Sequence, residues 1–262
     1  MSPWPQRIVC LTEETAETLY RLGAQERIVG ISGFTVRPPE ARRRKPKVAA
    51  FTSVKHSRIL ELEPDLVLGF SDLQADIAAE LIRAGVETYV FNQRSIAGIR
   101  AMVQRVAALV GLAEDGAALV ATLDSHVNAV AERIPAVGER PVVYFEEWDD
   151  PPITGIQWVS ELIAIAGGRD CFSDRAACGH ARDRILEDPG EVVRRAPDVI
   201  IGSWCGKRLR PERVAARPGW DHIPAVRNGH VYEIKSPDIL QPGPAALTDG
   251  LDQLAHCIAR AR

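Results

Sequence analysis

The feature that most constrains the fold is an alternation of short apolar runs with amphipathic stretches, which occurs twice along the chain. In the first half, runs and stretches follow one another at residues 7–11, 14–22, 27–32, 65–70, 72–84, 87–92 and 96–110. The run at 65–70 is almost wholly apolar, which is typical of a strand covered on both faces. This order predicts a mostly parallel sheet with helices on both sides.

The same alternation starts again in the second half of the chain. Its runs and stretches are residues 142–148, 158–166, 189–195, 198–204, 230–235 and 245–259. The two halves also share a junction, since Glu63-Pro-Asp-Leu-Val67 is echoed by Ala196-Pro-Asp-Val-Ile200. In both, a helix ends before proline and a buried strand begins. The sequence therefore predicts a second α/β lobe.

A single long helix is predicted between the two halves. Apolar residues recur there at three- and four-residue spacing, at Leu119, Val120, Leu123, Val127, Val130 and Ile134. They form one stripe on a helix of roughly 20 residues. We expect an N-terminal lobe at 1–112, a connecting helix at 113–136 and a C-terminal lobe at 137–262. The carboxyl ends of the strands of both lobes should then border one largely preformed cleft, because a rigid helix limits hinge motion.

Composition excludes several classes of function. The 262 residues are 46% hydrophobic and 26% charged, and the formal net charge of -3 argues against a nucleic-acid partner. No apolar run approaches the roughly 18 residues that cross a bilayer. Residues 1–7 lack a secretory signal pattern, so we expect a cytoplasmic protein as the sequence stands, or a periplasmic one if a signal has been removed. The five widely spaced cysteines favour reduced thiols.

Several segments resemble one known family. They are Arg7-Ile-Val-Cys-Leu-Thr12 with Glu17, Gly30-Ile-Ser-Gly-Phe34 with Pro38-Pro39, Ile59-Leu-Glu-Leu-Glu-Pro-Asp-Leu-Val67, Gly167-Gly168, 196–200 and Pro224-Ala-Val-Arg-Asn-Gly-His-Val-Tyr232. The chain resembles the helical-backbone periplasmic binding proteins of ABC importers, which include cobalamin- and siderophore-binding members. The resemblance implies an α/β fold of two Rossmann-like lobes joined by a backbone helix (the class III fold). It also implies a monomeric solute-binding protein, not an enzyme, that needs no cofactor and does not insert into the membrane.

The resemblance also implies a cobalamin-like or other metal-chelate ligand, gripped by aromatic side chains. Phe34 and Phe51 lie where the cobalamin-binding member has aromatics, and Phe70 ends a strand, although all three could equally be core residues. Glu13 and Glu14 follow the first strand, where that member has small residues and a proline. They would make the wall of the first lobe acidic, unless Glu14 merely caps a helix. Polar contacts are expected from Asn92 and Gln241.

In the second half, Phe145-Glu-Glu-Trp-Asp-Asp150 is the most unusual stretch. Glu147 and Trp148 are predicted cleft residues, while Asp149-Asp150 is interpreted as a solvated acidic turn. Trp204, Cys205 and Lys207 follow a buried strand and should also reach the cleft. The run Arg42-Arg-Arg-Lys45 is interpreted as a solvated surface loop.

His180 is a possible axial ligand for cobalt or iron, or else a surface histidine. Two alternatives to chelate binding stay open. One is direct metal-ion binding through Glu13, Glu14, Glu147, His180 or Cys205. The other is an enzyme with a Cys205 nucleophile and a His180 base.

The resemblance also implies an ABC permease as partner, through one exposed glutamate on each lobe. Here Ser57 and Gly190 occupy those positions, with Glu191 adjacent to the second. This departure puts delivery to an importer in doubt and leaves intracellular handling of a chelate as a variant of the same function.

Overall fold

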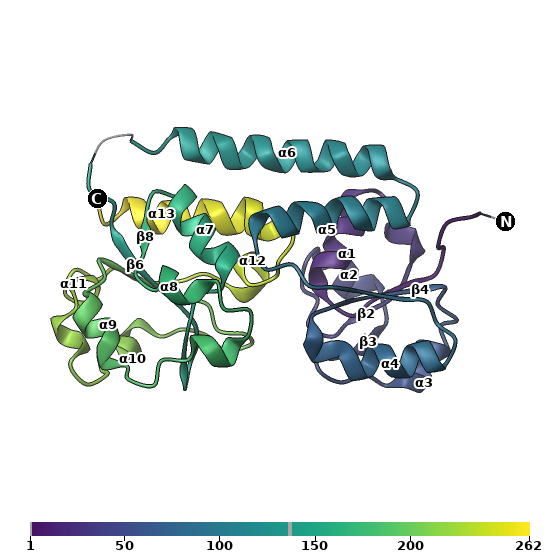
Figure 1. Cartoon of the computed structure of the whole chain (residues 1–262), viewed down its shortest axis with the longest axis horizontal. Coiled ribbons are helices and arrows are strands. Elements are labelled where there is room, and N and C mark those ends of the chain that lie inside the picture. The colour runs from purple at the N-terminus through teal and green to yellow at the C-terminus, as the bar shows by residue number, and fades with distance from the viewer. Residues whose placement is uncertain (1, 136–137) are drawn as a thin grey trace. The chain divides into compact units, whose positions relative to one another are not determined.

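The computed structural model describes residues 2–135 and 138–262 and divides the chain into two compact units. Unit 1 comprises Met1–Gln93 and Ala97–Leu123, and unit 2 comprises Arg94–Ile96 and Asp124–Arg262. Each unit has its own five-stranded sheet, coloured purple to blue for unit 1 and teal to yellow-green for unit 2 in Figure 1. The predicted α/β fold with two separate sheets is confirmed.

The sheet of unit 1 is parallel throughout, with strand order β3-β2-β1-β4-β5. Its strands are β1 (Ile8–Cys10), β2 (Ile28–Ser32), β3 (Lys47–Ala49), β4 (Leu66–Phe70) and β5 (Thr88–Phe91). The chain begins in the middle of this sheet, so the order reverses between β1 and β4. Such a reversal leaves a crevice at the carboxyl ends of the two strands.

Helices cover both faces of this sheet, with α1 and α5 on one side and α3 and α4 on the other (Figure 1). They are α1 (Glu13–Arg21), α2 (Pro39–Arg44), α3 (His56–Leu60), α4 (Ala75–Arg83) and α5 (Ile96–Leu109), with short 3₁₀ turns at η1 (Gln25–Arg27) and η2 (Asp72–Gln74). Ile59, Ile77 and Leu81 pack on Val9 and Val67 in one core. Covering both faces explains why these strands read as near-continuous apolar runs.

The long helix α6 spans Ala113–Glu132. Four residues of its apolar stripe, Val120, Leu123, Val127 and Val130, are buried. The compact units divide within α6, after Leu123, so the predicted boundaries at 112 and 137 stay a prediction. Gly116 permits the close approach of α6 to α5, because a Cβ there would lie 2.3 Å from the Cβ of Ala107.

Unit 2 has the strand order β10-β9-β6-β7, with β8 also pairing with β6. Its strands are β6 (Val142–Asp149), β7 (Pro152–Thr154), β8 (Arg169–Asp170), β9 (Val199–Gly202) and β10 (Val231–Glu233). Only β7 runs antiparallel to its neighbour among the paired strands of the described chain. The sheet is therefore mostly parallel, as predicted.

The helices of unit 2 are mostly short. They are α7 (Gln157–Ile165), α8 (Ser173–Ala176), η3 (Ala181–Arg184), α9 (Gly190–Arg195), α10 (Pro211–Ala215), η4 (Trp220–His222), α11 (Pro224–Arg227), α12 (Ser236–Ile239), the π-helical turn η5 (Ala246–Gly250) and α13 (Leu251–Ala259). The sequence predicted one closing helix at 245–259, but the structure has η5 followed by α13. The sequence pattern also missed β3, β7, β8 and the shortest helices, because elements of two to four residues carry too little periodicity to be recognised.

Candidate functional site

The crevice at the reversal of the unit 1 sheet is formed by the segments that follow β1 and β4. Glu13 and Glu14 come directly after β1 and open α1, but their side chains are only 3% and 0% exposed. Burial raises the pKa of Glu13 to about 8 and that of Glu14 to about 7. The two carboxyl groups therefore lie inside unit 1 and not on an acidic wall, and their role as ligand contacts stays a prediction.

Each of these two carboxyl groups is held by a different neighbour. The backbone N–H of Val36 donates to Oε2 of Glu13 over 2.5 Å, and the N–H of Arg37 also bonds this side chain. Thr12 donates its hydroxyl to Oε1 of Glu14 over 2.6 Å. Glu13 thus reaches the segment after β2, whereas Glu14 bonds locally.

That segment, residues 33–38, is called here the Phe34 loop. Phe34 is 59% exposed, one of the most exposed large apolar side chains in the described chain. Arg42 of α2 donates to the carbonyl oxygens of Gly33 and Thr35, at 2.9 and 3.2 Å. The interpretation of Arg42 as part of a solvated loop is corrected, because it lies on a helix and bonds the Phe34 loop.

The buried side-chain amide of Gln74 links the backbones of Phe51 and Phe70. The Oε1 of Gln74 accepts the backbone N–H of Phe70 at 2.9 Å, and its Nε2 donates to the carbonyl of Phe51 at 2.8 Å. Phe51 is partly exposed, whereas Phe70 is 8% exposed. Asn92 follows β5 and is exposed. The carboxyl edge of unit 1 therefore presents Phe34 and Phe51, while Phe70 is buried.

In unit 2, the end of β6 is tied down by ion pairs. The carboxylate of Glu146 is 1% exposed, pairs with both terminal nitrogens of Arg217 at 2.6 and 2.9 Å, and accepts the hydroxyl of Tyr144 at 2.9 Å. Glu147 pairs with Arg184 at 2.5 Å, and Arg184 itself is 1% exposed. A buried arginine–carboxylate pair offsets the free-energy cost of removing both charges from water only when its geometry is good. The two pairs therefore hold the end of β6 in one position.

The two residues after Glu147 form a cluster with Lys207. The Nζ of Lys207 lies 2.5 Å from Oδ2 of Asp149, 5.5 Å from the centre of the Trp148 ring and 5.1 Å from that of Trp204. Trp148 is partly exposed and donates its indole N–H to the carbonyl of Asp150 at 2.9 Å. Asp149 was interpreted as part of a solvated turn, but its side chain is only 16% exposed and holds this lysine.

Trp204 does not reach the surface, because it is 5% exposed and packs in the hydrophobic core of unit 2. Cys205 and His180 are exposed, and Gln241 is partly exposed. Within the described residues, no group of three or more His, Cys, Asp or Glu side chains could hold a metal ion. Direct metal-ion binding therefore has no support from the described residues.

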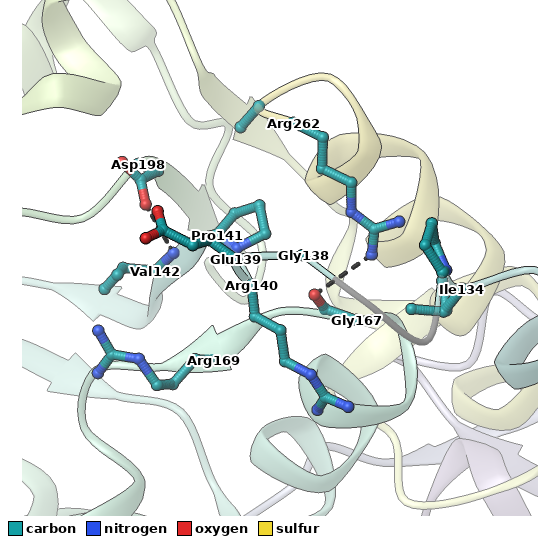
Figure 2. Close-up of a pocket in the computed structure, with 12 residues that line it drawn as sticks. Ile134, Gly138, Glu139, Arg140, Pro141, Val142, Gly167, Arg169, Asp198 and Arg262 are labelled. Atoms are coloured by element: carbon teal, nitrogen blue, oxygen red, sulfur yellow. Dashed lines mark hydrogen bonds between the residues drawn. The ribbon is translucent and has the colours of Figure 1, made fainter.

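Two cavities in unit 2 lie away from these residues. One, of about 850 Å³, opens at the start of β6, where Arg140, Arg169 and Arg262 surround it and Arg262 donates to the Gly167 carbonyl (Figure 2). The other, of about 520 Å³, is lined by charged side chains that include Arg175 and Glu191. None of the expected ligand contacts lines either cavity.

Comparison with known proteins shows to which family the chain belongs. A family model described as "Periplasmic binding protein" matches residues 8–237. The chain belongs to this family. Because the family consists of substrate-binding proteins and not of enzymes, the hypothesis of a Cys205 nucleophile with a His180 base is removed. Members need no cofactor, and membership implies a small-molecule ligand and a permease partner.

Individual relatives are similar over most of their length. The vitamin B12-binding protein of Vibrio campbellii is 26% identical, over 90% of this chain and 84% of that protein. The ABC transporter substrate-binding lipoprotein YvrC of Bacillus subtilis is 24% identical, over 97% and 80%. The periplasmic heme-binding protein BhuT, solved with two hemes, has a TM-score of 0.79 and 26% identity, covering 96% of this chain and 98% of that one.

The fold of this periplasmic binding protein also matches BtuF of Vibrio cholerae, with a TM-score of 0.77 at 20% identity and 98% coverage of both chains. The relatives therefore include proteins named for vitamin B12 and for heme. Across the described part of the chain, no helix is both long and apolar enough to cross a membrane. The cellular location stays a prediction.

The positions expected to dock on a permease lie on short helices. Ser57 lies on α3 and is exposed, and Gly190 begins α9. The adjacent Glu191 is held by Arg175 at 3.1 Å and by Arg195 at 2.5 Å. A permease arginine would have to compete with both guanidinium groups for that carboxylate.

The sequence pattern identified the aromatic residues of the candidate site. It missed the residues that hold the segments carrying these aromatic side chains. The side chains of Arg42, Gln74, Arg184 and Arg217 bond residues 7 to 71 positions away. A local pattern does not identify such partners. The one available signal was the placement of Glu13 at a strand end, where it was interpreted as a ligand contact.

Proposed function

We propose that this substrate-binding protein captures a large, flat metal chelate, either cobalamin or another metal tetrapyrrole, for an ABC importer. The observation that carries the proposal is the placement of partly exposed aromatic side chains at the carboxyl edges of both sheets. Phe34 and Phe51 lie at the edge of unit 1, and Trp148 lies beside Lys207 at the edge of unit 2.

Aromatic rings suit such a ligand for a physical reason. Each ring covers a wide apolar area, and its two side-chain torsions leave little conformational entropy to lose on binding. A rigid macrocycle offers a matching flat face. The names of relatives support the same class, since one is named for vitamin B12 and another was solved with two hemes.

The test is a spectral titration of the full chain with cyanocobalamin, hemin and a panel of ferric siderophores. We expect saturable binding of cyanocobalamin or hemin, and a loss of about tenfold in affinity for Phe34→Ala or Trp148→Ala. Ile82→Ala is the matched control for Phe34, because Ile82 is 60% exposed on α4, away from the carboxyl edge.

Trp4→Ala is the corresponding control for Trp148, since Trp4 lies near the N-terminus and is 47% exposed. Both control variants should bind like the unchanged protein. Saturable binding of siderophores alone would replace the tetrapyrrole with another chelate. No saturable binding of any probe would overturn the proposal.

A further inference from the structure

We infer that Glu13 and Arg42 are positioning residues that hold the Phe34 loop from opposite sides, so that an exposed aromatic ring is presented in one place. The inference rests on the proposed function, because it assigns to Phe34 a role in binding the chelate. Glu13, which the sequence predicted to be a ligand contact, would instead hold the loop that carries the ligand contact Phe34.

On the inner side, Glu13 bonds the N–H groups of the loop. Its Oε2 accepts the backbone N–H of Val36 at 2.5 Å, and the N–H of Arg37 bonds the same side chain. Glu13 is 3% exposed and belongs to the first turn of α1, which packs on the core of unit 1. The loop is therefore attached to a buried part of unit 1.

On the outer side, Arg42 bonds the carbonyl groups of the same loop. Its Nη1 donates to the oxygens of Gly33 and Thr35, the two residues that flank Phe34. The N–H of Phe34 itself bonds Oγ of Ser32 at 3.2 Å, and that of Gly33 bonds the carbonyl of Ala49 at 2.7 Å. Backbone groups along the loop are thus hydrogen-bonded to other parts of unit 1.

These contacts restrict the backbone of a loop that carries an exposed, bulky apolar side chain. A loop that must be ordered on binding loses conformational entropy at that step, and this loss weakens affinity. A loop already bonded on both sides has lost that entropy during folding. Glu13 and Arg42 should therefore raise affinity only through Phe34, without touching the ligand.

The chain offers a matched control for each residue. Glu14 is equally buried in the same turn of α1, but its Oε1 bonds Thr12 and not the loop. Arg43 follows Arg42 on α2 and is exposed in the same way. Glu14→Ala and Arg43→Gln therefore reproduce the chemical changes of Glu13→Ala and Arg42→Gln without removing a bond to the Phe34 loop.

The first measurement is amide hydrogen exchange in the full chain without ligand. We expect Arg42→Gln and Glu13→Ala to speed exchange at residues 33–38 by about tenfold, while Glu13→Gln, which keeps an oxygen acceptor, restores most of the protection. Glu14→Ala and Arg43→Gln should leave exchange at the loop unchanged. Unaltered exchange at 33–38 in Arg42→Gln would overturn the inference, whether or not Glu13→Ala folds.

The second measurement is a double-mutant cycle with hemin and cyanocobalamin as probes. Arg42→Gln should weaken binding about fivefold in the unchanged protein but less than twofold in a Phe34→Ala background. Equal effects in both backgrounds would show that Arg42 acts independently of Phe34 and would overturn the inference. If neither probe binds the unchanged protein, the proposed function fails, and hydrogen exchange still decides whether the two residues hold the loop.

Discussion

The carboxyl edges of the two sheets are built in contrasting ways. In unit 1, the loop that carries the exposed ring of Phe34 is held through hydrogen bonds to its backbone from Glu13 and Arg42, and Gln74 bonds the backbone of Phe51. In unit 2, the strand end that carries Trp148 is surrounded by ion pairs, through Arg184, Arg217 and Lys207. From this contrast we expect unit 1 to offer a ligand mainly apolar contact area and unit 2 to offer charge beside an aromatic ring.

The largest expected effect tests the ion pairs of unit 2. Arg217→Met leaves the buried carboxylate of Glu146 without its guanidinium partner, which should lower the free energy of unfolding by about 3 kcal/mol in chemical denaturation. The double variant Glu146→Gln/Arg217→Met removes the uncompensated charge and should recover most of this loss. A decrease below about 1 kcal/mol for Arg217→Met would show that unit 2 does not depend on its charges.

The next effect concerns the buried carboxyl groups of unit 1. Because burial raises the pKa of Glu13 to about 8 and of Glu14 to about 7, the folded chain binds more protons than the unfolded chain between pH 4.5 and 8. The stabilising contribution is therefore complete at low pH and is lost as pH rises through this window. We expect the free energy of unfolding to fall between pH 5 and pH 8.

Denaturation at several pH values measures this dependence. The double variant Glu13→Gln/Glu14→Gln should lose most of the slope, since an amide does not titrate. If the free energy of unfolding of this variant still falls with pH as before, other groups cause the pH dependence. Buried titrating carboxyl groups would then not distinguish unit 1 from unit 2.

A smaller effect would sharpen the comparison at Lys207. Lys207→Met removes the cation that lies between Trp148 and Trp204. We expect affinity for hemin, which carries carboxylates, to fall about fivefold while affinity for cyanocobalamin changes less than twofold, as measured by spectral titration. Lys47→Met, at the amino end of β3, is the control. Equal losses for both probes would contradict a role for charge in selectivity.

The smallest effect is expected on the outer helices, where the two units should not differ. Arg44 pairs with Glu40 on α2, and Arg194 pairs with Asp188 before α9, with all four side chains at least 41% exposed. Solvent screens such pairs, so Arg44→Ala and Arg194→Ala should each change the melting temperature by less than about 2 °C. A larger shift in either variant would extend the contrast between the units beyond their carboxyl edges.

Much of the fold could be predicted from local patterns. The strand at Leu66–Phe70 was evident because a strand covered on both faces is apolar throughout, and α6 because its apolar stripe recurs over 20 residues. The π-helical turn at Ala246–Gly250 was not evident, because its residues continue an ordinary helical pattern into Leu251–Ala259. Strands such as Arg169–Asp170 are recognised only through the neighbour with which they pair.

The residues of the candidate site were likewise only partly predictable from the sequence. Phe34 and Trp204 both follow a predicted strand, yet Phe34 is 59% exposed and Trp204 is 5% exposed. Whether an aromatic side chain after a strand turns toward solvent or into the core depends on what packs against it from distant parts of the chain. Leu209 and Val214 pack with Trp204 in one core, whereas Phe34 stays exposed among the described residues.

Sequence by itself determined the alternation of strands and helices, the long helix, and which strand ends carry aromatic and acidic residues, because these depend on neighbours a few positions apart. Only the tertiary structure decided that Glu13 is buried beneath the Phe34 loop, that Arg42 bonds the same loop, and that Lys207 lies beside Trp148. Burial and pairing are set by groups that meet in space after folding, and no short-range pattern records them.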